Sequence, residues 1–192
     1  MIDTKIKLNS ILKLEFNNYF PNKYLFIKAF LLGEKNIKIW RYQKFLRKLE
    51  YHKCVQSYNK LYHNWMYLWY SKKVNNLGVK LGIDAWHSIF DEGLIIYHSV
   101  GGIIVNSNAR IGKNCHLHGN NCIGNNGFNH QAPIIGDNCS LGVGAKIIGN
   151  VYIANDITIG AGAVVLKSCH ENGAVLIGMP ATIKELHKKA GN

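Results

Sequence analysis

The sequence predicts a mainly β protein, a parallel β-helix of six-residue repeats preceded by an α-helical N-terminal segment. Two observations predict it. Every sixth residue from Val105 to Val165 is a branched aliphatic except Asn129, whereas residues 1–80 repeat apolar side chains at helical spacing between Lys and Arg. A helix repeats apolar residues every three or four positions and a half-buried strand every two. A period of six therefore indicates short strands joined by turns, three per triangular coil of 18 residues.

In the N-terminal segment, Pro21 is expected to separate a first helix from a second, and Gly33 to end the second. A third helix is expected over 36–53 and a fourth, crowded with aromatic residues, over 54–73. The expected domains are a basic helical domain over 1–80, a β-helix domain over 81–185 and a short tail over 186–192.

The six-residue repeat is interrupted once. From Ile123 to Ile135 is two repeats, although Asn129 breaks the pattern between them. We therefore expect 125–134 to leave the prism as a loop and to return in register, and such loops often carry function. Small residues are expected where the wall turns, at the fifth position of the repeats: Ala109, Cys115, Cys139, Ala145, Ala163 and Cys169.

The charge of the chain is concentrated in its first 80 residues. They hold 16 Lys and Arg against 4 Asp and Glu, whereas 81–192 hold 7 of each, within a total of +12. The basic, aromatic helices are interpreted first as packing on their neighbours or on another subunit. A surface for membrane headgroups or an anionic acceptor is the alternative. Nucleic acid fits less well because no binding motif is present.

The five cysteines are interpreted as reduced and structural, since their number is odd and no CxxC pair occurs. A catalytic cysteine is the weaker alternative. The sequence contains no apolar run of about 18 residues, so it predicts no membrane span. The first residues lack the apolar core of a signal peptide. Together these features predict a cytoplasmic protein.

Four histidines are candidates for chemistry. His98 and His116 are 18 residues apart, which predicts that they stack one coil apart, and His130 falls in the expected loop. Imidazole, with a pKa of about 6.5, is the usual group for taking a proton from a hydroxyl. A hydroxyl that attacks a thioester needs such a base and donors for the oxyanion. His116, His118 and His130 also leave open a zinc site.

The segments IGKNCH, LGVGAK, IANDIT and IGAGAV resemble the hexapeptide-repeat acyltransferases, whose β-helix is left-handed, an exception to the usual crossover rule. The segment YHSVGGIIV (97–105) resembles the DHATGIVV segment that carries the catalytic histidine of hexapeptide serine acetyltransferases, and GMPATI (178–183) resembles their GVPARI. The resemblance covers about 81–185. It implies that His98 is the general base, Asp84 its orienting acid across a gap in the alignment, and His130 a second active-site histidine.

The same resemblance implies acetyl-CoA as co-substrate, lying between neighbouring prisms, and no metal. It implies a homotrimer, with pairing of two trimers left open. The positions that match the cofactor-binding turns are Gly142, Val143, Gly160 and Ala161, with Lys167 and Lys184 as candidates for the phosphates.

Two departures bear on the acceptor. The Asp before the catalytic histidine is Tyr97 here, and the Arg beside the loop histidine is Asn129, which argues against serine. The basic N-terminus and the YHxxGGIxVN pattern look more like relatives that acetylate capsular, exopolysaccharide or O-antigen sugars. We therefore expect an O-acetyltransferase acting on a sugar hydroxyl of a bacterial surface polysaccharide, with Tyr97, His118 and Asn129 binding the acceptor.

Such an acceptor would be anionic or lipid-linked, so the basic helices are expected to contact the inner face of the membrane. Serine acetyltransferase of cysteine biosynthesis is the main alternative. A γ-type carbonic anhydrase, which resembles this chain in its hexapeptide repeats and uses three histidine ligands, and a non-enzymatic membrane-associated scaffold remain open.

Overall fold

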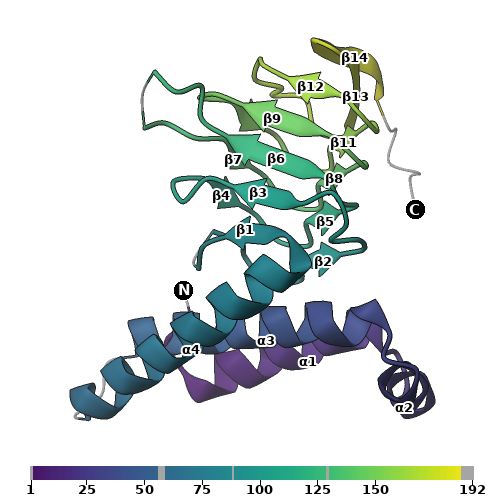
Figure 1. Cartoon of the computed structure of the whole chain (residues 1–192). Helices are drawn as coiled ribbons and strands as arrows, with labels where there is room; N and C mark the ends of the chain where they lie inside the picture. Colours follow the sequence, from purple (N-terminus) through teal and green to yellow (C-terminus); the bar gives the residue numbers. More distant parts are fainter. Residues whose placement is uncertain (1, 56–58, 88, 129, 187–192) are drawn as a thin grey trace. The chain divides into compact units, whose positions relative to one another are not determined.

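The computed structural model describes residues 2–55, 59–87, 89–128 and 130–186. The chain divides into two compact units, Met1–Leu81 and a second unit that begins at Gly82. The first unit is helical and the second is built of short strands (Figure 1).

The helical unit contains α1 (Lys5–Tyr19), α2 (Lys23–Leu31), α3 (Lys35–Cys54) and α4 (Lys60–Leu81), and α3 packs against the other three. Side chains of Thr4 and Asn22 cap the first two helices by accepting backbone N–H bonds. The breaks expected at Pro21 and Gly33 are confirmed. The fourth helix was placed wrongly, because it runs on to Leu81. Its buried Gly78 shows that packing outweighs the helix-breaking cost of about 1 kcal/mol that a glycine carries.

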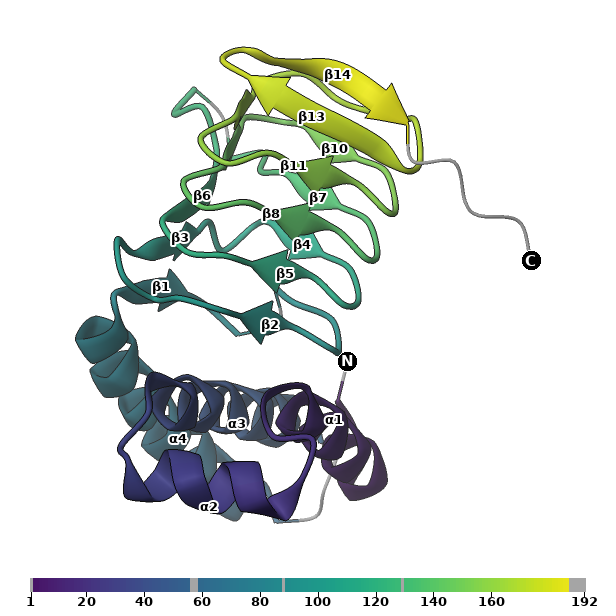
Figure 2. The same cartoon turned by 90° about the vertical axis from the view of Figure 1, so that its right-hand side faces the viewer.

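The second unit is a left-handed parallel β-helix with three faces, and Figure 2 shows its coils stacked one above another. Face A contains β1 (Ile83–Ala85), β3 (Ile103–Val105), β6 (Asn121–Gly124), β9 (Lys146–Ile148) and β12 (Val164–Val165). Face B contains β4 (Arg110–Ile111), β7 (Ile134–Ile135) and β10 (Tyr152–Ile153). Face C contains β2 (Ile95–Ile96), β5 (His116–Leu117), β8 (Ser140–Leu141), β11 (Thr158–Ile159), β13 (Ala174–Gly178) and β14 (Ala181–Leu186).

The chain visits the faces in the order A, B, C, so three edges separate them. The C–A edge comprises the turns 97–102, 118–120, 142–145 and 160–163. The A–B edge comprises 106–109, 125–133, 149–151 and 166–168. The B–C edge comprises 112–115, 136–139, 154–157 and 170–173.

The period of six is confirmed as the register of the core. The first residue of each repeat is buried from Val105 to Val165, apart from Asn129, which lies outside the described residues. The loop between β6 and β7 returns in register, since Arg110 pairs with Ile134 and Ile111 with Ile135. Backbone hydrogen bonds run from each coil to the next, so the aliphatic column and the ladder support the same register.

The first coil departs from the repeat, and the predicted stacking of His98 on His116 is wrong. Ile95 pairs with His116, and the Tyr97 N–H donates to Leu117 O at 2.9 Å. The turn that leads into β3 is three residues longer than the turn above it, which leads into β6. This extra length shifts the register, so that His98 lies beside Gly119.

The C-terminal end closes the solenoid differently. β14 turns back antiparallel to β13 and extends to Leu186, where the short tail was expected to begin. The rest of that expected tail, 187–192, lies outside the described residues.

Candidate active site

The C–A edge brings together His98 and four of the positions matched to cofactor binding. The exposed His98 lies in the lowest turn, and Gly142, Val143, Gly160 and Ala161 lie in the turns above. Backbone bonds tie these turns together, from Gly144 N to Gly119 O and from Gly162 N to Val143 O. These bonds stack the turns 118–120, 142–145 and 160–163, and Gly119 lies against the carbonyl oxygen of His98 in the turn before them.

Glycine is required on this edge by close approach of the coils. A Cβ atom on Gly142 would lie 2.7 Å from the Ala161 nitrogen, and a Cβ on Gly119 would lie 2.8 Å from the His98 carbonyl oxygen. Only a residue without a side chain fits either place. The coils therefore pack closely at these glycines, whereas side chains such as Val143 are exposed on the same edge.

Tyr97 and His118 form a stacked pair at the C–A edge, next to His98. Their ring centroids are 4.5 Å apart at 20°, and His118 Nε2 lies 3.2 Å from Ser140 Oγ. His116 lies on β5. Burial, together with the nearby His118, lowers the pKa of His116. His116 is therefore held neutral near pH 7. The two acceptor candidates that the structure describes lie together, while Asn129 lies outside the described residues.

Asp84 lies on face A. It pairs in register with Ile104, and its carboxylate is exposed. The turn that contains His98 leads into β3. The segment that contains Asp84 lies beside β3, and Ile103 N donates to Gly82 O at 2.8 Å between them. The predicted base therefore lies in the turn before β3, and the predicted acid lies on the neighbouring strand.

His130 lies at a different edge from His98. It belongs to the loop of the A–B edge, where its carbonyl oxygen accepts a 2.8 Å bond from Asn108 Nδ2. Lys167 is exposed at the same A–B edge, and Lys184 is exposed on β14. Within one chain, His98 and His130 therefore lie on different edges, while Asp84 lies on face A and Lys184 on β14.

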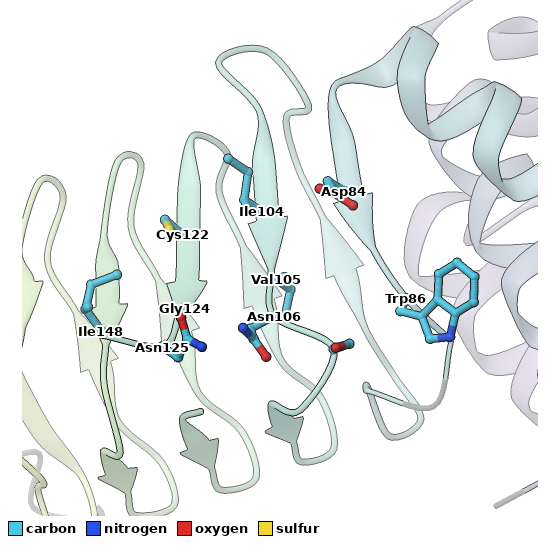
Figure 3. A pocket seen from close by; sticks show the side chains of 10 residues that line it. Asp84, Trp86, Ile104, Val105, Asn106, Cys122, Gly124, Asn125 and Ile148 are labelled. Atoms are coloured by element: carbon cyan, nitrogen blue, oxygen red, sulfur yellow. The ribbon is translucent and has the colours of Figure 1, made fainter. Parts of the chain in front are cut away.

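An open groove of about 450 Å³ lies on face A, near the base of this loop (Figure 3). Asp84 and Trp86 stand in its wall with Asn106, Ser107 and Asn125. Sequence reasoning missed the groove, because Asp84 and Trp86 belong to the first coil, which departs from the repeat. The available signal was the spacing of Ser107 and Asn125, which are 18 residues, or one coil, apart.

The cysteines of the β-helix are fillers, as predicted. Cys115, Cys139 and Cys169 are buried, and none of the five cysteines forms a disulfide. Burial raises the pKa of Cys139 to about 11 and raises that of Cys115 as well. Their thiols therefore stay protonated and make poor nucleophiles.

The zinc alternative is not assembled within one chain. His116 and His118 share face C, whereas His130 lies on the A–B loop. In the described parts of the chain, no three His, Cys, Asp or Glu side chains gather closely enough to hold a metal ion. None of the helices in these residues is long and apolar enough to cross a membrane.

Comparisons with known proteins agree with this geometry. Residues 132–167 match the family model for the bacterial transferase hexapeptide (six repeats). The serine acetyltransferase of Synechococcus elongatus is 30% identical over 94 residues, 48% of this chain and 38% of that protein. The serine acetyltransferase of Staphylococcus xylosus is 35% identical over 92 residues, 47% of this chain and 42% of that protein. The chain thus spans about two fifths of these relatives.

Solved structures extend the likeness to the helices. The crystal structure of Neisseria gonorrhoeae serine acetyltransferase superposes with a TM-score of 0.71 and 21% identity, covering 97% of this chain and 70% of that one. The soybean apoenzyme gives 0.68 and 22%, covering 92% and 68%. The fold is that of the serine acetyltransferases.

Proposed function

We propose that the protein is an acetyl-CoA-dependent O-acetyltransferase. The carrying observation is that His98 and the turns at Gly142 and Gly160 share one edge. The backbone groups of the glycine-containing turns suit the pantetheine arm of acetyl-CoA, whose thioester would end at the imidazole. In support, a solved serine acetyltransferase in complex with CoA shares the fold, with a TM-score of 0.58 and 22% identity over 76% of this chain and 56% of that one.

In this mechanism His98 takes the proton of an acceptor hydroxyl while the oxygen attacks the thioester carbonyl. The tetrahedral intermediate collapses, the carbon–sulfur bond breaks, and the CoA thiolate receives the proton back from His98. Asp84 orients the imidazole, and His130 binds the acceptor or the oxyanion. The buried, protonated cysteines favour this direct attack over an acyl-enzyme.

A complete site needs two copies of the chain. His98 lies on the C–A edge and His130 on the A–B edge. In the homotrimer, the C–A edge of each copy would therefore face the A–B edge of its neighbour. The same pairing would bring Lys167 of one copy toward the cofactor edge of its neighbour. Pairing of two trimers through the helices is compatible with this arrangement.

L-serine is the acceptor that the names of the relatives support. A sugar hydroxyl is the second candidate, and the Tyr97–His118 stack favours it, because no carboxylate stands directly before His98 to hold an ammonium group. With a lipid-linked sugar, the basic helices would meet the inner face of the membrane. In either case we propose that the reaction takes place in the cytoplasm, where reduced cysteines persist.

The test measures release of CoA thiol from acetyl-CoA, with L-serine in one set of wells and neutral and acidic bacterial oligosaccharides in the other. His98→Ala is expected to lower turnover by about 10²–10⁴-fold, the usual contribution of a general base. His170→Ala, at the exposed B–C edge, is the matched control and is expected to leave turnover unchanged.

Turnover by His98→Ala close to that of the wild type would remove His98 from the base position. Turnover with serine would make Tyr97 compatible with an amino-acid acceptor. Turnover with a saccharide and none with serine would assign the sugar. No thiol release with any acceptor would contradict the proposed function.

A further inference from the structure

We propose that the groove on face A binds a neutral sugar ring, with Trp86 as the surface on which the ring stacks. This inference rests on the O-acetyltransferase function proposed above, because it names the class of the acceptor. It assigns a binding role to residues of successive coils on face A that lie apart from the cofactor edge.

The groove has the size of a small-molecule site. Its volume of about 450 Å³ lies within the range of ligand pockets. It extends along face A from β1 to Ile148 on β9, which is three steps between neighbouring strands, or about 14 Å. A short oligosaccharide fits along that length, with one ring seated at the Trp86 end.

The charges of the groove select against a carboxylate and against a phosphate. Among the described residues that line the groove, Asp84 is the one ionisable group apart from the thiol of Cys122, and none is Lys, Arg or His. The carboxylate of serine and the phosphates of CoA require cationic or N–H-rich partners. A neutral polyol instead donates its hydroxyls to the Asp84 carboxylate and bonds the side-chain amides.

Trp86 supplies the apolar part of the site. It is 44% exposed, and Figure 3 shows its indole at one end of the groove, with Asp84, Asn106 and Asn125 along the rest. An aromatic face packs well against the C–H face of a sugar, while polar groups around it bond the hydroxyls.

The polar wall is held in place before any ligand binds. Asn106 N donates to Ile123 O at 2.8 Å, and Asn106 Oδ1 accepts from Asn108 N at 2.9 Å. Asn108 in turn bonds the loop of His130 at its carbonyl oxygen. The groove is therefore bordered by the loop that carries the second histidine of the proposed reaction, which suits an acceptor subsite.

The experiment is saturation-transfer NMR on the full-length protein without acetyl-CoA. The probes are three trisaccharides: maltotriose and tri-N-acetylchitotriose as neutral ligands and trigalacturonate as the acidic one. At least one neutral probe is expected to bind, and trigalacturonate is expected to bind more weakly because Asp84 repels it. Trp86→Ala is expected to weaken neutral binding about tenfold, and Trp86→Phe to retain part of it.

The matched control is Trp65→Ala, because Trp65 is 62% exposed on α4 and lies outside the groove. It is expected to leave saccharide binding unchanged. Circular dichroism establishes that each variant folds. Sedimentation establishes whether Trp86→Ala changes the oligomeric state.

No binding of either neutral trisaccharide to the wild type would overturn the proposal. Unchanged binding in Trp86→Ala would overturn it too. A smaller oligomer for Trp86→Ala would show that the groove is covered by a second copy, which also contradicts it. Saccharide binding without thiol release from acetyl-CoA would support the sugar site and contradict the proposed function. Turnover with serine and no saccharide binding would support the proposed function and contradict the sugar site.

Discussion

In the β-helix the interior is a column of aliphatic side chains, whereas the helical unit buries a charged triad. Arg47 is 2% exposed, and its guanidinium bonds Glu15 on α1 at 2.7 and 3.0 Å and Glu50 on α3 at 2.9 Å. Burial alone would lower the pKa of Arg47, but the two carboxylates raise it above its ordinary value. The triad joins α1 to α3 by directional hydrogen bonds. The aliphatic column of the β-helix instead depends on side-chain volume and on the register of the strands.

The difference explains how each unit presents its surface. In the β-helix the place of a residue in the six-residue period determines whether its side chain is buried, so no buried ion pair is needed to set the packing. In the helical unit two of the four acidic residues of 1–80 are consumed by the triad. Its remaining surface is strongly cationic, with exposed Tyr24, Phe30 and Leu31 on α2. Substitutions at three places test this difference between the two units.

The largest expected effect is in the triad. Arg47→Met leaves two carboxylates buried without their cation, so we expect the free energy of unfolding to fall by about 3–5 kcal/mol. Urea denaturation measures it, and hydrogen exchange shows whether α1 and α3 lose protection first. Replacing Glu15, Arg47 and Glu50 together by apolar residues is expected to recover much of the loss. A single Arg47→Met change costing under 1 kcal/mol would mean that the triad is solvated.

A smaller effect is expected at the B–C edge, where amide side chains form a ladder outside the aliphatic column. Asn114 Nδ2 donates to Asn138 Oδ1 at 3.0 Å, and Asn138 Nδ2 donates to Asp156 Oδ1 at 2.9 Å. Asn138 also adopts a φ of 57°, in the left-handed region that strains most L-residues. The position therefore combines two bonds with a backbone requirement.

Asn138→Ala loses the ladder bonds and meets the strain, so we expect it to lower the free energy of unfolding by about 2 kcal/mol. Asn138→Gly is the matched control, because glycine loses the same bonds without the strain, and it should cost about 1 kcal/mol less. Chemical denaturation of the three proteins measures both. Equal costs for Ala and Gly would remove the backbone contribution.

The smallest effect is a pH dependence in the helical unit. His52 Nδ1 lies 2.9 Å from His63 Nδ1, between α3 and α4. Burial, His63 and Lys48 lower the pKa of His52 to about 4, below the ordinary 6.5. The unfolded chain therefore binds more protons than the folded one between pH 6.5 and 4, so stability falls as pH drops through this window.

His52→Gln is expected to flatten this part of the stability curve, while His170→Gln on the β-helix leaves it in place. Melting temperatures between pH 7.5 and 4 measure both. An identical pH slope in wild type and His52→Gln would contradict the assignment.

Much of the β-helix followed from the sequence alone, and its physical reason is local. The period of six selects the buried residues from Val105 to Val165, since each coil bonds the next at constant register. The loop at 125–134 followed from the same phase. The helical breaks at Pro21 and Gly33 followed from backbone chemistry.

The tertiary structure decided what the period does not encode. It set Tyr97 against His118, in place of His98 over His116, because the first turn into face A is three residues longer than the next. It placed His98 and His130 at different edges of the prism. It also joined Trp86 to Asp84 and to amides of later coils in one groove. Local spacing determines which side of the wall a residue occupies, whereas turn length and stacking determine which residues meet.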